Sequence, residues 1–519
     1  PYITIAQKVT TIGTVTDATG HYFLKNLPEG NFILEVSSVG YKTVTRNVTL
    51  KKGKTLEEDF EIEEDAIALD GVVVSANRSE TTRRLAPTLV NVVDLKLFET
   101  TNSSTLSQGL NFQPGVRVET NCQNCGFQQV RINGLDGPYT QILIDSRPVF
   151  SALSGVYGLE QIPASMIERV EVMRGGGSAL FGSSAIAGTI NIITKEPLRN
   201  SGQLSHTLTA LGGGSSFDNN TSLNASLVTD DHRAGLYIFG QNRHRSGYDY
   251  DGDGFTELPK LKNQTVGFRS YLKTSTYSKL TFEYHHMQEF RRGGDMLDRP
   301  PHEAHIAEQL QHSIDGGSLK FDYFSPDEKN RLSIFASAAN TDRDSYYGPG
   351  NDPLKAYGKT TDLTAMGGAQ YVHTFDKCFF MPSDLTAGLE YNRDRLKDNM
   401  WGYNRHTDQT VNIYSAFLQN EWKNDRWGIL IGGRLDKHNM VDNVIFSPRA
   451  NLRFNPTQNI NLRLSYSSGF RAPQAFDEDM HIENVGGTVA MIERAKDLKE
   501  EKSQSFSVSA DLSLIHISE

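Results

Sequence analysis

The chain has 519 residues and a formal net charge of −10, and no apolar run approaches the ~20 residues that a membrane-spanning helix needs. No basic block offsets the acidic balance, which argues against nucleic-acid binding as the main activity. The 45 glycines, 26 phenylalanines and 20 tyrosines fit a β-rich, turn-rich protein. Helical membrane proteins are therefore excluded. A β-barrel is not, because barrel strands alternate apolar and polar residues.

Short alternating segments with turn signals between them fill residues 10–62. Examples are the runs 13–24 and 27–36, the second of which begins with a Pro-Glu-Gly turn at residues 28–30. This pattern predicts a small antiparallel β-sandwich over residues 1–65. The chain does not start with a signal-peptide pattern, and Pro1 looks like an arbitrary start. We therefore expect the sandwich to be truncated at its N-terminus.

An acidic run from Glu57 to Asp65 leads into a short β-branched segment within residues 66–80. Such a segment suits a strand that is released and added to the exposed sheet edge of a partner, where main-chain hydrogen bonds supply the affinity. The alternative is that it forms the ordinary first strand of the next domain. The residues of this segment are Asp70, Gly71, Val72, Val73, Val74, Ser75 and Ala76.

Residues 81–197 are expected to form a compact, glycine-punctuated unit. Residues 167–172 alternate apolar and charged side chains, as a half-buried strand does, and residues 187–194 form a β-branched run. Between them, Gly175 to Gly177 lack the Lys-Ser or Lys-Thr ending of a phosphate-binding loop. The order is strand, glycine turn, strand.

Three cysteines are present, Cys122, Cys125 and Cys378. The Cys-x-x-Cys pair has three interpretations: a redox motif, half of a metal site or a short disulfide. A zinc site needs about four ligands, and no second such pair or nearby histidine pair supplies them. In an oxidising compartment, a disulfide between Cys122 and Cys125 is the favoured interpretation. Cys378 is expected to be a small apolar strand residue.

From residue 198 onward, segments such as 234–240, 279–284 and 461–466 alternate apolar or aromatic residues with polar ones. This repeated pattern predicts an antiparallel transmembrane β-barrel, with a soluble array of β-sandwiches as the alternative. The segment has room for about 12–14 strands, whereas plugged outer-membrane transporters close with about 22. We therefore expect a partial barrel over residues 198–511 and a non-native tail at 512–519.

An acidic loop interrupts the barrel pattern. Asp249, Asp251, Asp253 and Glu257 occupy positions 1, 3, 5 and 9 of a calcium-loop spacing. Lys260 stands where a bidentate glutamate belongs, which excludes an EF-hand. A loop ordered by Ca²⁺ and a plain acidic turn are the two readings, and the turn is favoured because Asp-Gly pairs are common turn formers.

Four runs of this chain resemble the plug domain of TonB-dependent outer-membrane receptors. They are Leu110-Asn111-Phe112-Gln113-Pro114-Gly115-Val116, Val130-Arg131-Ile132-Asn133-Gly134-Leu135, Ile142-Leu143-Ile144-Asp145 and residues 167–194. Residues 10–62 resemble the carboxypeptidase-regulatory-like domain that precedes the plug in receptors of Bacteroidetes type, and residues 70–76 resemble a TonB box. The fold class is therefore expected to be all-β dominated: a small β-sandwich at 1–65, a TonB-box linker at 66–80, an α+β plug at 81–197 and a partial barrel.

The resemblance also assigns roles to individual residues. It implies that two plug arginines, Arg131 and Arg174, pair with two barrel-wall glutamates, for which Glu390 and Glu421 are the expected partners; solvated barrel charges are the alternative. Phe470-Arg471-Ala472-Pro473 is similar to a box of haem receptors, in which a following histidine, here His481, would ligate iron. The second box of those receptors departs here, reading Ala-Lys-Asp-Leu at 495–498.

The function implied by the resemblance is TonB-dependent import of a metal chelate across the outer membrane of a Gram-negative bacterium. A ferric siderophore is the leading substrate, with haem or cobalamin as alternatives. The expected partners are the TonB energy-coupling complex, outer-membrane lipid and the chelate. There are two further alternatives. One is a glycan importer that is paired with a surface lipoprotein, and the other is an adhesion barrel that does not transport. The sequence shows no nucleophile and base pair or paired carboxylates that specify an enzyme.

Overall fold

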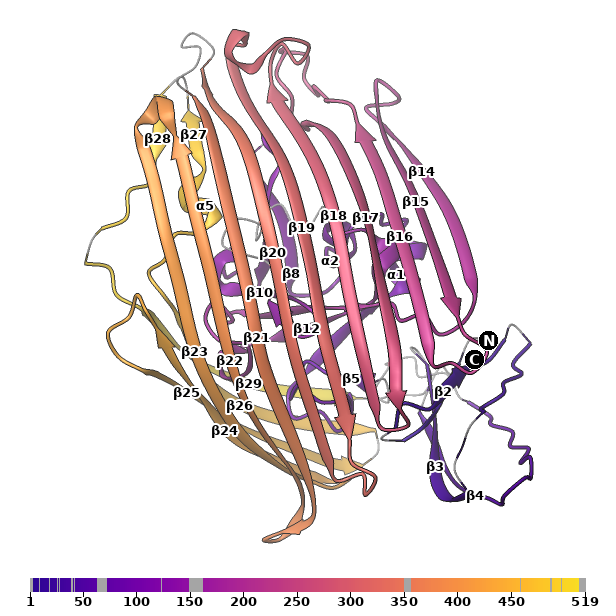
Figure 1. Cartoon of the computed structure of the whole chain (residues 1–519). Helices are drawn as coiled ribbons and strands as arrows, with labels where there is room; N and C mark the ends of the chain where they lie inside the picture. The colour runs from indigo at the N-terminus through magenta and orange to yellow at the C-terminus, as the bar shows by residue number, and fades with distance from the viewer. Residues whose placement is uncertain are drawn as a thin grey trace.

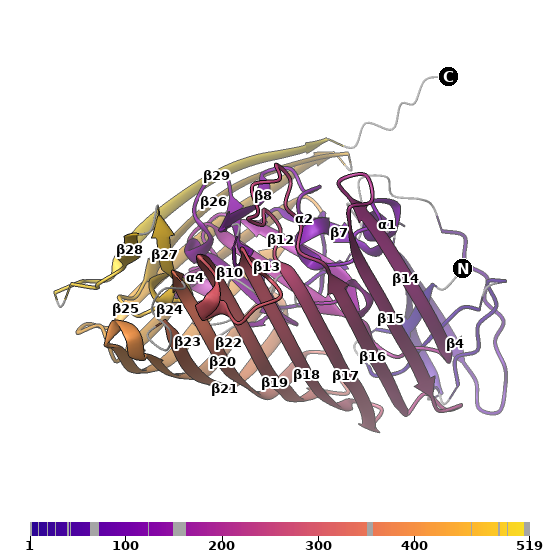
Figure 2. The ribbon, with the colours of Figure 1, turned by 90° about the horizontal axis from the view of Figure 1, so that it is seen from above.

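The structure is a computed structural model that describes residues 3–8, 10–17, 19–25, 27, 29–38, 41, 43–62, 72–122, 124–148, 162–349, 356–457, 459–485, 488–495 and 497–512. A long curved β-sheet, from magenta to yellow in Figure 1, partly surrounds a central unit, and the N-terminal domain lies beside one end of this sheet. Figure 2 shows the same sheet from above, curving around the central unit. None of the described helices is long and apolar enough to cross a membrane.

The N-terminal domain contains a four-stranded antiparallel sheet in the order β2-β1-β3-β4. Alternate residues of β3 (Phe32, Leu34 and Val36) are buried on one face, as the twofold period of a strand requires. Leu24 and Phe60, from segments outside the strands, cover that face. The strands are β1 (Thr4–Gln7), β2 (Gly13–Val15), β3 (Gly30–Ser37) and β4 (Val44–Leu50).

The central unit, here called the plug, is built on a five-stranded sheet in the order β11-β10-β13-β12-β7. Strands β10 and β13 are parallel, and the other neighbours are antiparallel. The strands are β7 (Val90–Asp94), β10 (Thr140–Ile144), β11 (Arg147–Pro148), β12 (Ile167–Arg174) and β13 (Gly188–Thr194). Glycine is required where β13 begins, since Gly188 has φ +153° and a Cβ there would lie 2.2 Å from the Met173 carbonyl oxygen.

Two hairpins and several short helices complete the plug. The hairpin of β8 (Val116–Cys122) and β9 (Phe127–Ile132), here called the apex hairpin, rises from the sheet, and a two-residue pair joins β5 (Val72–Val73) to β6 (Thr81–Thr82). The helical elements are α1 (Leu95–Thr100), α2 (Leu106–Leu110), α4 (Ser178–Phe181), η1 (Gly137–Tyr139) and η2 (Ala164–Met166). Buried aliphatic residues of β12 and β13, including Val170, Val172 and Ile190, pack with Leu106 and Leu110 into one core.

The curved sheet, here called the wall, has 14 antiparallel strands with β14 and β29 at its two edges. The predicted range of 12–14 strands is confirmed, and the described strands form an open wall rather than a closed ring. The strands are β14 (Ser201–Leu211), β15 (Ser216–Val228), β16 (Ala234–Arg245), β17 (Lys260–Ser275), β18 (Ser278–Gly294), β19 (Ile306–Phe324), β20 (Asn330–Pro349), β21 (Tyr357–Cys378), β22 (Met381–Met400), β23 (Arg405–Lys423), β24 (Trp427–His438), β25 (Ile445–Thr457), β26 (Ile460–Arg471) and β29 (Glu501–Leu512).

The two ends of the wall differ in their connections. Neighbouring strands are joined at one end by short turns, and the N-terminal domain touches this end, where the Thr11 hydroxyl donates to the carbonyls of Ser275 and Thr276 at 3.1 and 3.0 Å. The opposite end, here called the mouth, carries the longer connections. These hold η3 (Pro301–Glu303), η4 (Trp401–Tyr403), α5 (Asp477–Met480), β27 (Ile482–Val485) and β28 (Thr488–Met491).

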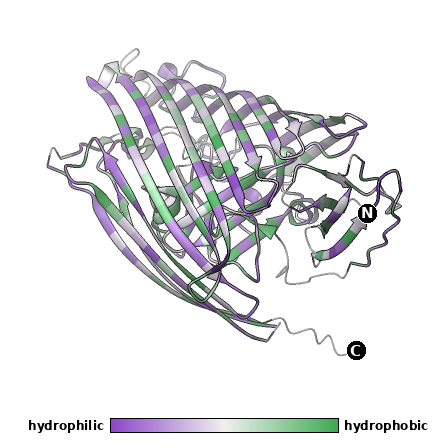
Figure 3. Ribbon diagram, turned by 60° about the horizontal axis from the view of Figure 1, so that its bottom comes forward, coloured by the Kyte–Doolittle hydropathy of each residue, from purple (hydrophilic) through white to green (hydrophobic). Residues whose placement is uncertain are grey.

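The two faces of the wall have opposite polarity, and Figure 3 shows hydrophobic and hydrophilic residues alternating along its strands. Leu389 and Val508 are 66% and 83% exposed on the outer face, whereas Arg291 and Arg343 are 1% exposed. Exposed apolar side chains also include Leu204, Leu223, Leu227, Val266, Leu418, Ile431 and Leu464. This is the reverse of a water-soluble sheet and the pattern of a sheet that faces hydrocarbon.

The expected fold class, all-β dominated with an N-terminal β domain, a plug and a partial barrel, is confirmed by this architecture. A small β-sandwich was expected at the N-terminus, and the described residues there form one four-stranded sheet. Two site predictions fall outside the described residues: Asp70 and Gly71 of the linker segment, and residues 513–519 of the expected tail. One strand prediction was wrong in part. Residues 167–172 were expected to be half-buried, but Val170, Glu171 and Val172 are all fully buried, because the segment around Ser75 covers the second face.

Candidate functional site

Residues 72–76, the described part of the expected TonB box, are held inside the plug. Val73 and Ala76 are fully buried in an apolar cluster with Met173, Leu180 and Phe181. Val72 and Val73 form the short strand β5, in which Val72 is half-buried and Val73 is buried. The sequence predicted a short strand at this place. A partner strand can reach it only after it leaves this cluster.

Glu171 of β12 is the main polar anchor of this segment. One carboxylate oxygen of Glu171 accepts hydrogen bonds from the amides of Val74 and Ser75, both at 2.9 Å, and from the Ser75 hydroxyl at 2.7 Å. The other oxygen pairs with Arg169 at 3.0 Å. Asn191 donates to the Ser75 hydroxyl at 2.9 Å. Both oxygens of this buried carboxylate accept hydrogen bonds, so its loss leaves several buried donors without an acceptor.

Arg78 links the same segment to the wall. Its guanidinium forms an ion pair with Glu390 of β22 and packs over the rings of Phe181 and Phe417 at 4.9 and 4.8 Å. The second oxygen of Glu390 pairs with Arg434 of β24 at 2.7 Å. Arg434 in turn bonds Asp436 at 2.8 Å and donates to the Leu180 carbonyl at 3.1 Å. Burial lowers the pKa of Arg78, and Glu390 opposes that shift.

Further contacts seat the residues beside Arg78. Glu421 of β23 accepts a hydrogen bond from the Asn77 side chain at 2.7 Å, and Gln419 donates to the Asn77 carbonyl at 3.1 Å. Arg449 donates to the Ala76 carbonyl at 3.1 Å. The wall therefore holds residues 76–78 through strands β21, β22, β23 and β25.

The predicted pairing of Arg131 and Arg174 with Glu390 and Glu421 was wrong. Arg131 pairs with Glu119, at 2.5 Å, and with Asp136, because the apex hairpin and the turn after it supply nearby carboxylates. Arg174 donates to the Pro114 carbonyl of the plug.

The two glutamates are indeed buried plug-to-wall anchors, but their plug partners are Arg78 and Asn77. Sequence reasoning missed Arg78, Asn77, Arg434 and Glu171. The available signal was the position of Arg78 two residues after the box.

A cavity of about 150 Å³ lies between the plug and the wall. From the plug, Gln129, Phe181 and Ser183 line it, and from the wall, strands β21 to β24 do so. The wall residues include Glu390, Asp394, Arg434 and Asp436. The ion pairs that hold Arg78 are thus also part of the surface of this cavity.

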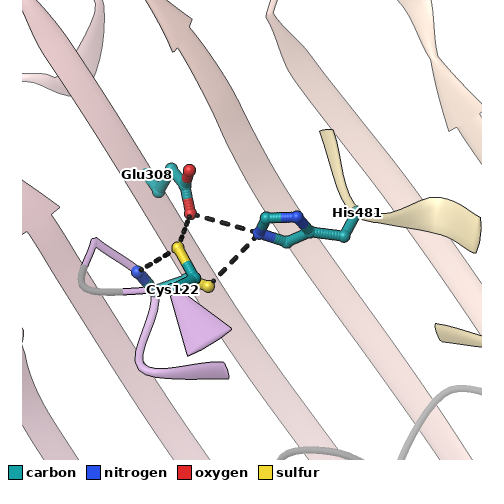
Figure 4. Close-up of side chains that lie close together, drawn as sticks. Cys122, Glu308 and His481 are labelled. Carbon is teal, nitrogen blue, oxygen red and sulfur yellow. Dashed lines mark hydrogen bonds and ion pairs between the residues drawn. The ribbon is translucent and has the colours of Figure 1, made fainter. Parts of the chain in front are cut away.

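The cysteine pair lies at the tip of the apex hairpin, and the structure holds Cys122 and Cys125 as two thiols rather than as the predicted disulfide. The Cys122 thiol donates to Glu308 at 3.2 Å, and the Cys125 sulfur lies 3.4 Å from Nε2 of His481 (Figure 4). These partners orient the two sulfurs toward the wall and the mouth. Cys378 lies at the short-turn end of β21.

His481 is enclosed at the same place. Phe127 and Tyr347 lie beside its ring, with centroids 5.5 and 5.3 Å away, and Nε2 is 3.4 Å from Glu308 (Figure 4). A haem iron would have to displace these contacts to reach Nε2.

The same neighbours act on the Cys122 thiol. A hydrogen bond with Cys125 contributes most to the lowering of the Cys122 pKa to about 7, burial opposes this lowering, and His481 adds to it.

The acidic loop gathers three of its four predicted ligands. Asp249, Asp251 and Glu257 bring carboxylate oxygens within 4.8 Å of one another, while Asp253 accepts from the Phe255 amide at 2.8 Å. Asp249 accepts from the amides of Gly252 and Gly254 at 2.7 and 2.9 Å. These bonds are those of a tight turn, and calcium binding stays a prediction.

The apex hairpin touches the wall at a glycine. A Cβ on Gly293 of β18 would lie 1.9 Å from the Asn124 carbonyl oxygen. We expect Gly293→Ala to push the tip off the wall and cost about 1–3 kcal/mol, seen as faster hydrogen exchange over residues 118–130. Gly240→Ala is the control, since its nearest backbone atom is 3.7 Å away. Equal exchange in both variants would contradict this seating of the tip.

The geometry defines a class of protein: an antiparallel wall, apolar outside and polar inside, filled by a plug that grips an extended segment. The chain belongs to the TonB-dependent receptor family. Its residues 187–515 match the family described as TonB dependent receptor-like, beta-barrel. Residues 82–189 match the TonB-dependent Receptor Plug Domain, and residues 1–74 match the CarboxypepD_reg-like domain.

Individual relatives are distant. The vitamin B12 transporter BtuB of Vibrio vulnificus (strain CMCP6) is 25% identical over 424 residues, covering 79% of this chain and 64% of that protein. The chain thus spans less than two thirds of that relative. Among solved structures, the siderophore receptor PirA of Acinetobacter baumannii has a TM-score of 0.70 at 18% identity, covering 83% of this chain and 69% of that one. A mutant of the ferric enterobactin receptor PfeA of Pseudomonas aeruginosa has a TM-score of 0.68 at 18% identity, covering 83% and 70%. These structures share the fold.

Proposed function

We propose that this chain is part of a TonB-dependent importer of a metal chelate in the outer membrane of a Gram-negative bacterium. The observation that carries the proposal is the buried segment 72–76, a short strand gripped by Glu171 on one side and by wall residues on the other. A segment of this kind is ready to be released and paired with a sheet edge of a partner. In this family that partner is TonB, which here would draw on inner-membrane energy.

The outer face of the wall supports the proposed location. Exposed leucine, valine and isoleucine side chains on its strands fit the hydrocarbon layer of a membrane, and the buried arginines and carboxylates face the plug. The short-turn end would face the periplasm with the N-terminal domain, and the mouth would face the exterior. The proposed domains are residues 1–65, 66–80, 81–197 and 198–511.

The cavity suggests how cargo and the box segment communicate. Glu390 and Arg434 line the cavity and also hold Arg78, which lies two residues beyond Ala76. A ligand that binds Glu390 or Arg434 would weaken the ion pairing that holds Arg78 and would favour release of the segment. Binding and release are then linked by the difference in ligand affinity between the two states of the plug.

A ferric siderophore is the proposed cargo, and a cobalamin is the second candidate. The solved siderophore receptors support the first through a shared fold over more than four fifths of this chain. The relative named as a vitamin B12 transporter supports the second. Growth rescue of a receptor-deficient strain by either nutrient as the limiting source separates the two. Rescue by neither would contradict both.

Replacing Val72 by proline tests the transport proposal. Proline removes the backbone donor that strand pairing uses, so we expect uptake to fall to background while the receptor stays folded. Val72→Ala keeps the donor and is expected to keep most of the uptake. Uptake is followed with the labelled nutrient in energised cells. Full uptake by the proline variant would rule out this segment as the point of TonB contact.

A further inference from the structure

At the mouth, four side chains with metal-binding atoms converge from three distant parts of the chain. Cys122 and Cys125 come from the apex hairpin, Glu308 from the mouth end of β19, and His481 from the connection after α5. Figure 4 shows how Cys122, Glu308 and His481 lie relative to one another. Their ligand atoms all lie within 4.8 Å of one another. We propose that these residues form a resident zinc site that ties the plug apex to the wall and to the mouth.

The spacing of the ligand atoms fits a tetrahedral ion. Zinc binds sulfur at about 2.3 Å and nitrogen or oxygen at about 2.0–2.2 Å, which puts the edges of its coordination tetrahedron at ~3.3–3.8 Å. The closest distances here are 3.2 Å between Cys122 Sγ and Glu308, and 3.4 Å from His481 Nε2 to both Cys125 Sγ and Glu308. The donors therefore stand close to where a bound ion would hold them.

The donor set selects the metal. Two thiolates and an imidazole favour a borderline-soft ion over Ca²⁺ or Mg²⁺, which take oxygen ligands. The carboxylate as fourth ligand suits Zn²⁺, which accepts sulfur, nitrogen and oxygen in one tetrahedral shell. Binding would send to solvent any protons that the two sulfurs and Nε2 of His481 carry, because only a deprotonated sulfur and an unprotonated ring nitrogen coordinate the ion.

The site is closed, which argues for a structural ion rather than for cargo. Cys125 is fully buried, Glu308 is 2% exposed, and the His481 side chain is 11% exposed. Leu310, Tyr347, Met400 and Ile482 pack around it in one apolar cluster with Phe127. Four protein ligands leave no open position for a chelate, and open positions are what catalytic or exchanging zinc sites keep.

Such an ion would cross-link segments that the chain leaves far apart. Glu308 lies 186 residues from Cys122, and His481 lies 356 residues from Cys125. Holding them together orders the apex hairpin and the connection after β26, which together form part of the mouth. The inference stands whether or not the cargo of the receptor is a siderophore.

Cobalt titration of the reduced, metal-free 519-residue chain in detergent tests the site. We expect one equivalent of Co²⁺ to give thiolate-to-cobalt charge-transfer bands and tetrahedral d–d bands, which Zn²⁺ then abolishes. Cys125→Ser should remove the charge-transfer contribution of that sulfur. His481→Ala and Glu308→Gln should weaken binding by more than the roughly 10–100-fold typical of losing an outer-shell partner. Cys378→Ser is the matched control and should bind normally.

A measurement on the unaltered chain tests the site even if the variants fail to fold. Chelation of the zinc-loaded protein should speed hydrogen exchange in residues 116–132 and 472–485 and leave β14 to β16 unchanged. Three results would overturn the proposal. They are cobalt binding without charge-transfer bands, a Cys125→Ser variant with unchanged charge-transfer bands, and hydrogen exchange that does not change when the chelator is added. A freshly isolated, metal-free protein with Cys122 and Cys125 joined in a disulfide would overturn it as well.

Discussion

Glu390→Gln is expected to free the segment that ends at Arg78 from the wall. Glu390 lies between the guanidinium groups of Arg78 and Arg434. The side chains of Arg78 and Glu390 are 5% and 3% exposed. Glutamine leaves two buried cations with Asp436 as the nearest remaining carboxylate. Breaking a buried pair by removing one partner typically costs about 3–5 kcal/mol, because the other charge stays buried without compensation.

Hydrogen exchange at residues 74–79 measures this loss. We expect the free energy of local opening there to fall by about 3–5 kcal/mol, with little change in the wall strands. The double variant Arg78→Gln/Glu390→Gln should recover part of the loss, by about 0.5–3 kcal/mol, because it removes both charges and leaves the Arg434–Asp436 pair intact. Losses that simply add in the double variant would contradict a direct pair.

The exposed pair of Lys329 and Asp376 provides the control. Both side chains are open to solvent at the short-turn end of the wall, at 42% and 79% exposure. Surface pairs of this kind contribute little, so Asp376→Asn should leave exchange at residues 74–79 unchanged. The contrast separates an effect of burial from a general effect of removing a carboxylate.

The fold could be predicted from the sequence because its signals are local. Each wall strand carries its own alternation of apolar and polar residues, as in residues 234–240, so the strand type is readable without knowing its neighbours. The same holds for the glycine turn between β12 and β13. The burial of Glu171 was not readable, since an alternating strand looks half-buried until another segment covers its second face.

The site could be predicted only where its residues are neighbours in sequence. The box segment was found, but its anchors Glu171 and Arg449 come from other domains of the chain. The sequence near Cys122 and Cys125 offers no further zinc ligands, whereas the structure brings Glu308 and His481 to them from far along the chain. Pairing Arg131 with a wall glutamate failed because a charge takes a nearby carboxylate in space, here Glu119.

Glu171→Ala is expected to expose the box segment without any ligand. The substitution removes the acceptor of three hydrogen bonds from Val74 and Ser75, in a place where Ser75 and Glu171 are fully buried. Each buried donor left without a partner costs about 1–3 kcal/mol, so the closed arrangement loses at least one such amount. The segment therefore spends a larger fraction of time in the state that a TonB strand can bind.

The affinity of the receptor for a soluble TonB C-terminal domain reports this shift. The apparent dissociation constant is the intrinsic one divided by the competent fraction, and every ~1.4 kcal/mol changes it tenfold. A loss of at least about 1 kcal/mol therefore predicts at least about fivefold tighter binding without substrate. Glu168→Ala on the same strand is the control, because Glu168 is 39% exposed and pairs with Arg169. Adding Val72→Pro to Glu171→Ala should abolish the gain, since the freed segment could no longer pair as a strand. Unchanged affinity in Glu171→Ala, or a gain that survives the proline, would show that Glu171 does not control access to the segment.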